Sequence, residues 1–138
     1  MRTTTKWIHG EEFESRQDHH PVRLDGSGKH GVSPKAVLLS ALAACSGIDV
    51  VEILRKMRVP FESLEIDAQA RMTTTIPKIF EHIELVFRID ADPKSEERIH
   101  KAIRLSLDKY CGVATMLRKN CAISYRLMVG GKSLLSSS

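Results

Sequence analysis

The sequence of 138 residues is poor in aromatic residues, in cysteine and in long hydrophobic runs. Only 5% of the residues are aromatic, and basic and acidic residues are interleaved without a basic block, so the net charge of +4 does not indicate a nucleic-acid-binding surface. The longest uncharged run, residues 36–48, is too short to span a membrane, and the first ten residues lack the apolar core of a signal peptide. We therefore expect a cytoplasmic protein with neither nucleic acid nor a membrane as a partner.

The common short motifs of metal and nucleophile chemistry are also missing. There is no CxxC, HExxH or GxSxG. The six histidines are scattered, and the one adjacent pair, His19 and His20, is more typical of solvated loop residues than of a metal site. The glycine-rich segment DGSGKHGV, residues 25–32, lacks the spacing of a phosphate-binding loop and is predicted to be a flexible connection. We therefore expect neither a metal nor a cofactor.

The pattern of hydrophobic residues predicts an α+β fold. Residues 1–130 are expected to form a single domain, and residues 131–138 a flexible C-terminal tail. Strands with one wet face indicate antiparallel sheets. The expected elements are short strands within residues 1–24, a helix at 34–57, strands at 64–72 and 83–89, a helix from 92 to about 107, a kink or restart at Gly112, and a strand at 122–129.

The helix at 34–57 is the element around which the fold is expected to form. Ser33 can cap it, and Pro34 occupies the first helical position, where the missing N–H costs nothing. Residues 36–48 carry no charge on any side of the helix, whereas the residues after Ile48 are amphipathic. A helix that is apolar all round must be covered all round, so we expect a buried central helix.

The three cysteines are the remaining candidates for chemistry, since an odd number argues against a structural disulfide framework. Cys45 lies among small residues of the central helix. Cys111 is expected at the start of a helical turn near Lys109, where the helix dipole and the positive charge favour a thiolate. Nothing near Cys121 would activate its thiol. From the residues alone, inert packing remains the simpler interpretation of these thiols.

Two segments of the sequence together resemble the OsmC/Ohr family of hydroperoxide-reducing proteins. They are PKAVLLSALAACSGIDVVEILRKM around Cys45 and DKYCGVATMLRKNCAISY around Cys111. The resemblance implies an OsmC-like fold that forms an intertwined homodimer, with the cysteine helices buried at its centre. It also implies that Cys45 is the peroxidatic and Cys111 the resolving cysteine of an antioxidant peroxidase. An organic hydroperoxide would oxidise Cys45 to a sulfenic acid, Cys111 would form a disulfide with it, and an external dithiol would reduce the disulfide.

The sequence departs from the family pattern at the residues that assist the thiolate. Family members place a glutamate where this chain has Lys35 or Ala36, and their N-terminal arginine has only Arg16 and Arg23 as candidates here. Asp49 lies one turn after Cys45, where a carboxylate would raise the pKa of the thiol, so we expect it to have a structural role. The alternative to a peroxidase is a non-catalytic OsmC-like dimer that acts as a small-molecule-binding or redox-sensing module.

Overall fold

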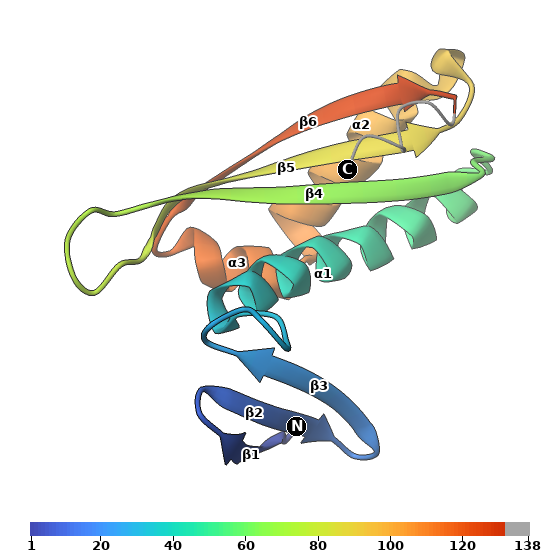
Figure 1. Cartoon of the computed structure of the whole chain (residues 1–138). Coiled ribbons are helices and arrows are strands. Elements are labelled where there is room, and N and C mark those ends of the chain that lie inside the picture. Colours follow the sequence, from blue (N-terminus) through green and yellow to red (C-terminus); the bar gives the residue numbers. More distant parts are fainter. Residues whose placement is uncertain (132–138) are drawn as a thin grey trace. The chain divides into compact units, whose positions relative to one another are not determined.

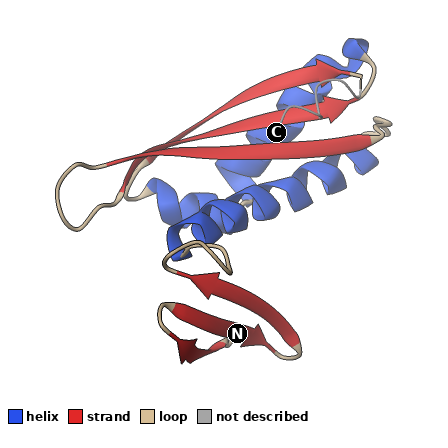
Figure 2. Cartoon of the chain, viewed as in Figure 1, coloured by secondary structure: helices blue, strands red, loops and turns tan. Residues whose placement is uncertain are grey.

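The computed structural model describes residues 1–131 and has the predicted α+β class, with strands and helices in the order shown in Figures 1 and 2. Its contacts divide the chain into two compact units, Met1–Leu38 and the residues from Leu39 onward. The single domain expected over residues 1–130 therefore stays a prediction. A flexible tail was expected at residues 131–138, and all of it except residue 131 lies outside the described residues.

The first unit is an antiparallel sheet of three short strands. The strands β1 (Thr4–His9), β2 (Glu12–Gln17) and β3 (His20–Asp25) pair in the order β1-β2-β3, which confirms the short strands expected before residue 25. Gly10, in the turn between β1 and β2, has a φ of 53°, a left-handed conformation that glycine adopts without steric cost.

The second unit contains a three-stranded sheet whose central strand is β5. The strand β4 (Ser63–Met72) pairs antiparallel with β5 (Phe80–Asp90), as predicted. The strand β6 (Ala122–Gly130) pairs parallel with β5, so the expectation of purely antiparallel sheets is wrong for this pair. The reason is the long helical crossover between the two strands, which returns the chain to the same end of the sheet. A strand with polar residues on one face has its other face buried. This pattern does not reveal whether the neighbouring strand runs parallel or antiparallel to it.

The helices of the second unit carry the residues that matter for chemistry. The helix α1 (Pro34–Lys56) agrees with the predicted helix to within a residue at its end. A 3₁₀ turn (Pro93–Ser95) leads into α2 (Glu96–Leu105), and its first turn is capped by the side chain of Asp92. A single π-helical turn (Ser106–Tyr110) follows, and α3 (Gly112–Arg118) begins after it. Gly112 therefore marks a restart, and the π turn before it was not predicted.

The core of the second unit lies between its sheet and its helices (Figure 1). Every second residue of β5 is fully buried from Ile83 to Ile89, and α2 contributes Ile99, Ala102 and Ile103. The helix α1 contributes a single stripe at every fourth position, Leu42, Ser46, Val50 and Leu54.

The rest of the α1 surface is not covered by this one chain. Ile48, the last residue of the uncharged stretch, is 64% exposed. The all-round burial expected from the sequence is thus not supplied by a single copy. By length and apolar composition, α1 also meets the criterion for a membrane-crossing helix, a weak indication because core helices commonly meet it as well.

Candidate active site

The two cysteines predicted to form the site are brought together in the second unit. Cys45 lies in the middle of α1, is half-buried, and packs against the core. Cys111 lies at the end of the π turn and is completely buried. The two free thiols are neighbours, since the Cys45 thiol is among the groups that raise the pKa of Cys111. The fold therefore brings together two cysteines that are 66 positions apart in the sequence.

The π turn determines where Cys111 lies. The backbone N–H of Cys111 donates to the carbonyl oxygen of Ser106 at 2.7 Å, five residues earlier. Cys111 then leaves the helical conformation, with φ −75° and ψ 104°, and becomes the N-cap of α3. Its Sγ accepts a hydrogen bond from the N–H of Ala114 at 3.4 Å. π turns of this kind are found frequently at functional sites.

Burial decides the ionisation of Cys111. Loss of solvation raises the pKa of the thiol to about 11, although the hydrogen bond from the Ala114 N–H acts in the opposite direction. The neighbouring Cys45 thiol and the Asp49 carboxylate raise this pKa further. The expectation that a helix N-terminus and Lys109 would favour a thiolate is therefore wrong in its net direction. The ammonium group of Lys109 lies over the ring of Tyr110, 5.3 Å from its centroid.

A small polar cluster lies between the two elements that carry the thiols. Ser46, which follows Cys45 on α1, and Ser106, which opens the π turn, are both fully buried. The Ser106 hydroxyl lies 3.0 Å from Oδ2 of Asp49 and 3.2 Å from Oγ of Ser46. A structural role was expected for Asp49 from the sequence, whereas neither serine was predicted to matter. The helical spacing of Ile99, Ala102, Ile103 and Ser106 does place Ser106 on the inward face, whereas no sequence pattern indicates its contact with Asp49.

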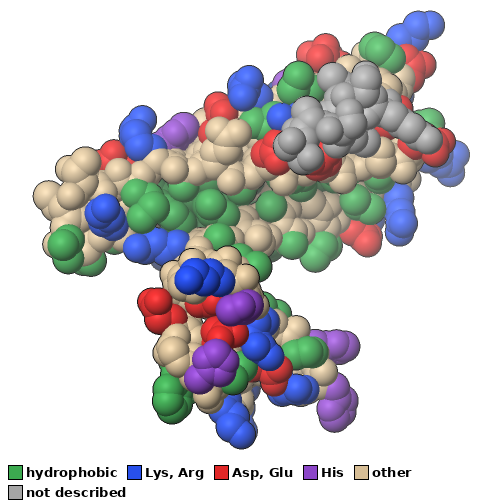
Figure 3. All heavy atoms as spheres, viewed as in Figure 1, with side chains coloured by type: hydrophobic (Ala, Val, Ile, Leu, Met, Phe, Trp, Pro, Cys, Tyr) green, Lys and Arg blue, Asp and Glu red, His purple; other side chains and the backbone are tan. Residues whose placement is uncertain are grey.

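The exposed side of α1 forms one wall of an apolar groove. The groove has a volume of about 750 Å³ and lies between α1 and the segment from Phe61 to Ile66. Small residues of α1 form its floor, and a Cβ added at Gly47 would lie 3.0 Å from Cδ1 of Ile66. On the face seen in Figure 3, hydrophobic side chains lie along α1 and β4. The residues that line the groove are Ser40, Ala43, Ala44, Gly47, Ile48, Val51, Glu52, Phe61, Leu64 and Ile66.

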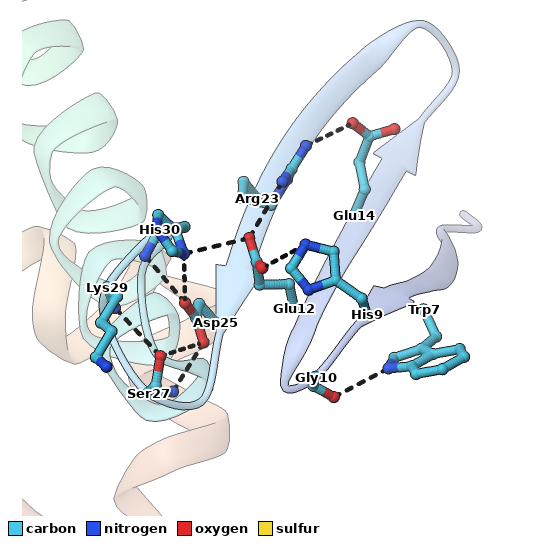
Figure 4. Close-up of polar contacts among 10 residues, drawn as sticks. All are labelled: Trp7, His9, Gly10, Glu12, Glu14, Arg23, Asp25, Ser27, Lys29 and His30. Carbon is cyan, nitrogen blue, oxygen red and sulfur yellow. Dashed lines mark hydrogen bonds and ion pairs between the residues drawn. The ribbon is translucent and has the colours of Figure 1, made fainter.

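The first unit contains a separate polar network, which Figure 4 shows. The buried carboxylate of Glu12 lies 2.9 Å from Nε2 of His9 and 3.5 Å from the guanidinium of Arg23. Oxygen and nitrogen ligand atoms of Glu12, Asp25 and His30 lie within 4.8 Å of one another, a grouping that the sequence did not predict. These donors have the chemistry to hold a divalent cation, but Arg23 already supplies positive charge beside Glu12.

Asp25 organises the glycine-rich loop that follows β3. Its carboxylate accepts hydrogen bonds from the backbone N–H and hydroxyl of Ser27, both at 2.8 Å, and from the N–H of His30 at 2.9 Å. The His30 N–H, followed by the Ser27 hydroxyl, lowers the pKa of Asp25 to about 2. The loop thus has more internal hydrogen bonding than the predicted flexible connection implies.

The two candidate arginines are both paired with carboxylates of the first unit. Arg23 contacts Glu12 and Glu14, and Nε of Arg16 lies 2.8 Å from Oε1 of Glu14. Within residues 39–131, no arginine or lysine side chain is hydrogen-bonded to the Cys45 thiol. The local sequence around Cys45 therefore positions the thiol without supplying a cation for it.

Comparisons with known proteins agree with this architecture. A family model described as OsmC-like protein matches residues 26–126. Protein YhfA of Escherichia coli strain K12 is 34% identical over 127 residues, which are 91% of this chain and 95% of that protein. The crystal structure of an OsmC-like protein from Mycoplasma pneumoniae superimposes with a TM-score of 0.82 at 21% identity, covering 94% of this chain and 96% of that one. The organic hydroperoxide resistance protein OhrB of Bacillus subtilis has a TM-score of 0.64 at 14% identity, with coverage of 92% and 96%.

Proposed function

Because the chain belongs to the OsmC-like family, we propose that it is a thiol peroxidase that reduces organic hydroperoxides through Cys45 and Cys111. The observation that carries the proposal is the proximity of these two thiols, which come from distant parts of the sequence. Chance burial of two free cysteines does not require them to be neighbours. The proposed place of action is the cytoplasm, where thiols are kept reduced.

The proposed reaction has three balanced steps. The Cys45 thiolate attacks the outer oxygen of the hydroperoxide, the O–O bond breaks, and the alcohol leaves after taking a proton, so that Cys45 becomes a sulfenic acid. The Cys111 sulfur then attacks the Cys45 sulfur, a disulfide forms, and water leaves. An external dithiol reduces this disulfide through two thiol–disulfide exchanges and becomes a disulfide itself.

The environments of the two thiols support this division of roles. Cys45 is half-buried, so a hydroperoxide can reach its sulfur more readily than that of the fully buried Cys111. The pKa of about 11 keeps Cys111 protonated at neutral pH. A protonated Cys111 does not compete with Cys45 for the oxidant. When Cys45 has become a sulfenic acid, the Cys111 sulfur attacks it, and the Cys111 proton leaves with the sulfenic hydroxyl group as water.

The groove beside α1 supports a homodimer as the proposed form of the protein. Its floor consists of small residues that allow a second helix to approach closely, and its rim contains the exposed Ile48. A second copy of α1 would present the same small and apolar residues. Contact between the two copies would remove the exposed side of each α1 from water. The apolar residues on the exposed side of α1 would then have the cover that one chain does not provide.

A redox-sensing module is the second candidate, and the lack of thiolate assistance favours it. Lys35 and Ala36 stand where a glutamate is expected in the family pattern, and no cation within residues 39–131 is hydrogen-bonded to Cys45. A thiol without such assistance reacts slowly with peroxide. The pair would then form a reversible disulfide without turning over a substrate at a useful rate.

Consumption of cumene hydroperoxide in the presence of a small dithiol separates the two candidates. For a peroxidase we expect Cys45→Ser to abolish turnover and Cys121→Ser to match the wild type as the control. Without the dithiol, Cys111→Ser should consume one equivalent of peroxide and stop at the Cys45 sulfenic acid, with no protein disulfide formed. If the wild type consumes peroxide no faster than Cys45→Ser, the peroxidase proposal is wrong. Slow formation of a Cys45–Cys111 disulfide without turnover would identify the sensor instead.

A further inference from the structure

The buried cluster of Ser46, Asp49 and Ser106 has no part in the chemistry described above. Two hydroxyl groups with no exposure to solvent are costly to bury unless they are hydrogen-bonded. The cluster satisfies them, since no buried side-chain nitrogen or oxygen within the described part of the chain lacks a partner. It also connects the two elements that carry the thiols. Its position suggests a function beyond packing.

The geometry identifies the hydrogen bond that dominates the cluster. The Ser106 hydroxyl has three acceptors within reach, at 3.0 Å for Asp49 Oδ2 and 3.2 Å for both Oγ and the carbonyl oxygen of Ser46. A hydroxyl has one proton to donate. The carboxylate is the closest and the only charged acceptor, so the proton is directed to Asp49. Oγ of Ser106 can in turn accept the hydroxyl proton of Ser46.

Ser106 is tied to both cysteine-bearing elements at once. Its side chain is held by Asp49, which lies one helical turn after Cys45 on α1. Its backbone carbonyl accepts the N–H of Cys111 at 2.7 Å, the bond that closes the π turn. A displacement of Ser106 away from α1 would therefore carry Cys111 away from Cys45.

We propose that Asp49 and Ser106 are positioning residues for the disulfide step, which hold the π turn against α1 and so keep the Cys111 thiol beside Cys45. The proposal rests on the proposed function in that it assigns a use to the thiol pair. It adds that the effective concentration of Cys111 at Cys45 is set by one hydrogen bond to a carboxylate. The role requires an acceptor oxygen at position 49, and an uncharged acceptor there would weaken the hydrogen bond from Ser106 without removing it.

Equilibration with glutathione tests the proposal without any peroxide. Oxidised glutathione takes two electrons and two protons from the Cys45–Cys111 pair and becomes two glutathione thiols, leaving the protein disulfide. The midpoint of this titration measures the effective concentration of the pair. All variants are made in a Cys121→Ser background, so that thiol exchange is confined to the two cysteines of interest.

We expect Ser106→Ala and Asp49→Ala each to lower the effective concentration about tenfold, which is the loss of one charge-assisted hydrogen bond and shifts the midpoint by about 30 mV. Asp49→Asn keeps an acceptor oxygen and should stay within threefold of the parent. The matched control is Ser95→Ala, because Ser95 is also a buried serine whose hydroxyl is hydrogen-bonded, but at the start of α2.

Three outcomes would overturn the proposal: an unchanged midpoint in Ser106→Ala, an equal shift in Asp49→Asn and Asp49→Ala, or a similar shift in Ser95→Ala. Thermal unfolding of each variant is measured first. If Ser106→Ala is unfolded at the assay temperature, the proposal is tested by comparing the midpoints of Asp49→Asn and Asp49→Ala alone. Loss of peroxide turnover with the expected midpoint shifts would reject the peroxidase function and leave the positioning role intact.

Discussion

The ionisation of Cys111 is the most quantitative prediction that the structure allows. Burial is the main cause that raises the pKa of this thiol from 9.0 to about 11. At pH 8 the thiolate fraction then falls from about 10% to about 0.1%, so alkylation by iodoacetamide should be about 100-fold slower than for an ordinary thiol. Because the folded protein keeps this proton to higher pH than the unfolded chain, stability should also decline as the pH rises from 9 through 11.

The three thiols can be followed separately in the wild-type protein. Cleavage after lysine and arginine places Cys45, Cys111 and Cys121 in different peptides, residues 36–55, 110–118 and 120–126. Brief alkylation at each pH, quenching and mass spectrometry therefore give one pH profile for each thiol. Restricted access lowers the plateau of a profile, whereas ionisation determines its midpoint. The same measurement in guanidinium chloride supplies the reference for each peptide.

A midpoint for Cys111 at or below 9 in the folded protein would refute this reasoning. Such a result would mean that the hydrogen bond from Ala114 and the start of α3 outweigh the loss of solvation. The roles proposed for the two cysteines would then have to be reconsidered, since Cys111 would compete with Cys45 for the oxidant.

Two further predictions concern the groove and the first unit. If a second copy covers the groove, Ile48→Glu should convert a dimer into a 15.5 kDa monomer in sedimentation experiments. Ile76→Glu, at a residue 91% exposed outside the groove lining, serves as the control, and a wild type that sediments as a monomer would contradict the dimer. Because the pKa of Asp25 is lowered from 3.8 to about 2, the stability it contributes should be lost as the pH falls through this range. Asp25→Asn should lack this acid transition in the fluorescence of Trp7, the single tryptophan, and an identical transition in both proteins would show that another group is responsible.

The elements that repeat a simple period could be predicted from the sequence, and the connections between them could not. The uncharged stretch from Ala36 to Ile48 located α1, and alternation located β4 and β5. The parallel direction of β6 depends on how the crossover packs, which no local pattern records. The π turn before Cys111 also has no local signature, because it is stabilised by the contact of Ser106 with α1.

The sequence proposes the two cysteines of the candidate site, and it does not reveal the electrostatics around Cys111. Cys45 and Cys111 were selected from the sequence, and the structure places them together. The thiolate expected at Cys111 depended on the helix end and on Lys109, which are its neighbours in sequence. Loss of solvation has the larger effect on this thiol, and it depends on residues that pack over the sulfur from elsewhere in the fold. The effect of residues distant in sequence on the pKa of Cys111 cannot be judged before the fold is known.

The parallel pairing of β5 with β6 has a consequence for the order of folding. The two strands are separated by residues 91–121, and the whole of this segment must close on itself before β6 can add to the sheet. Closing a segment of this length costs chain entropy before the strand pairing returns any stabilisation, so we expect it to be a late and slow event. Cys111 lies inside the closing segment and Cys45 lies outside it. In a chain that has not completed its sheet, the two cysteines are therefore separate, ordinary thiols.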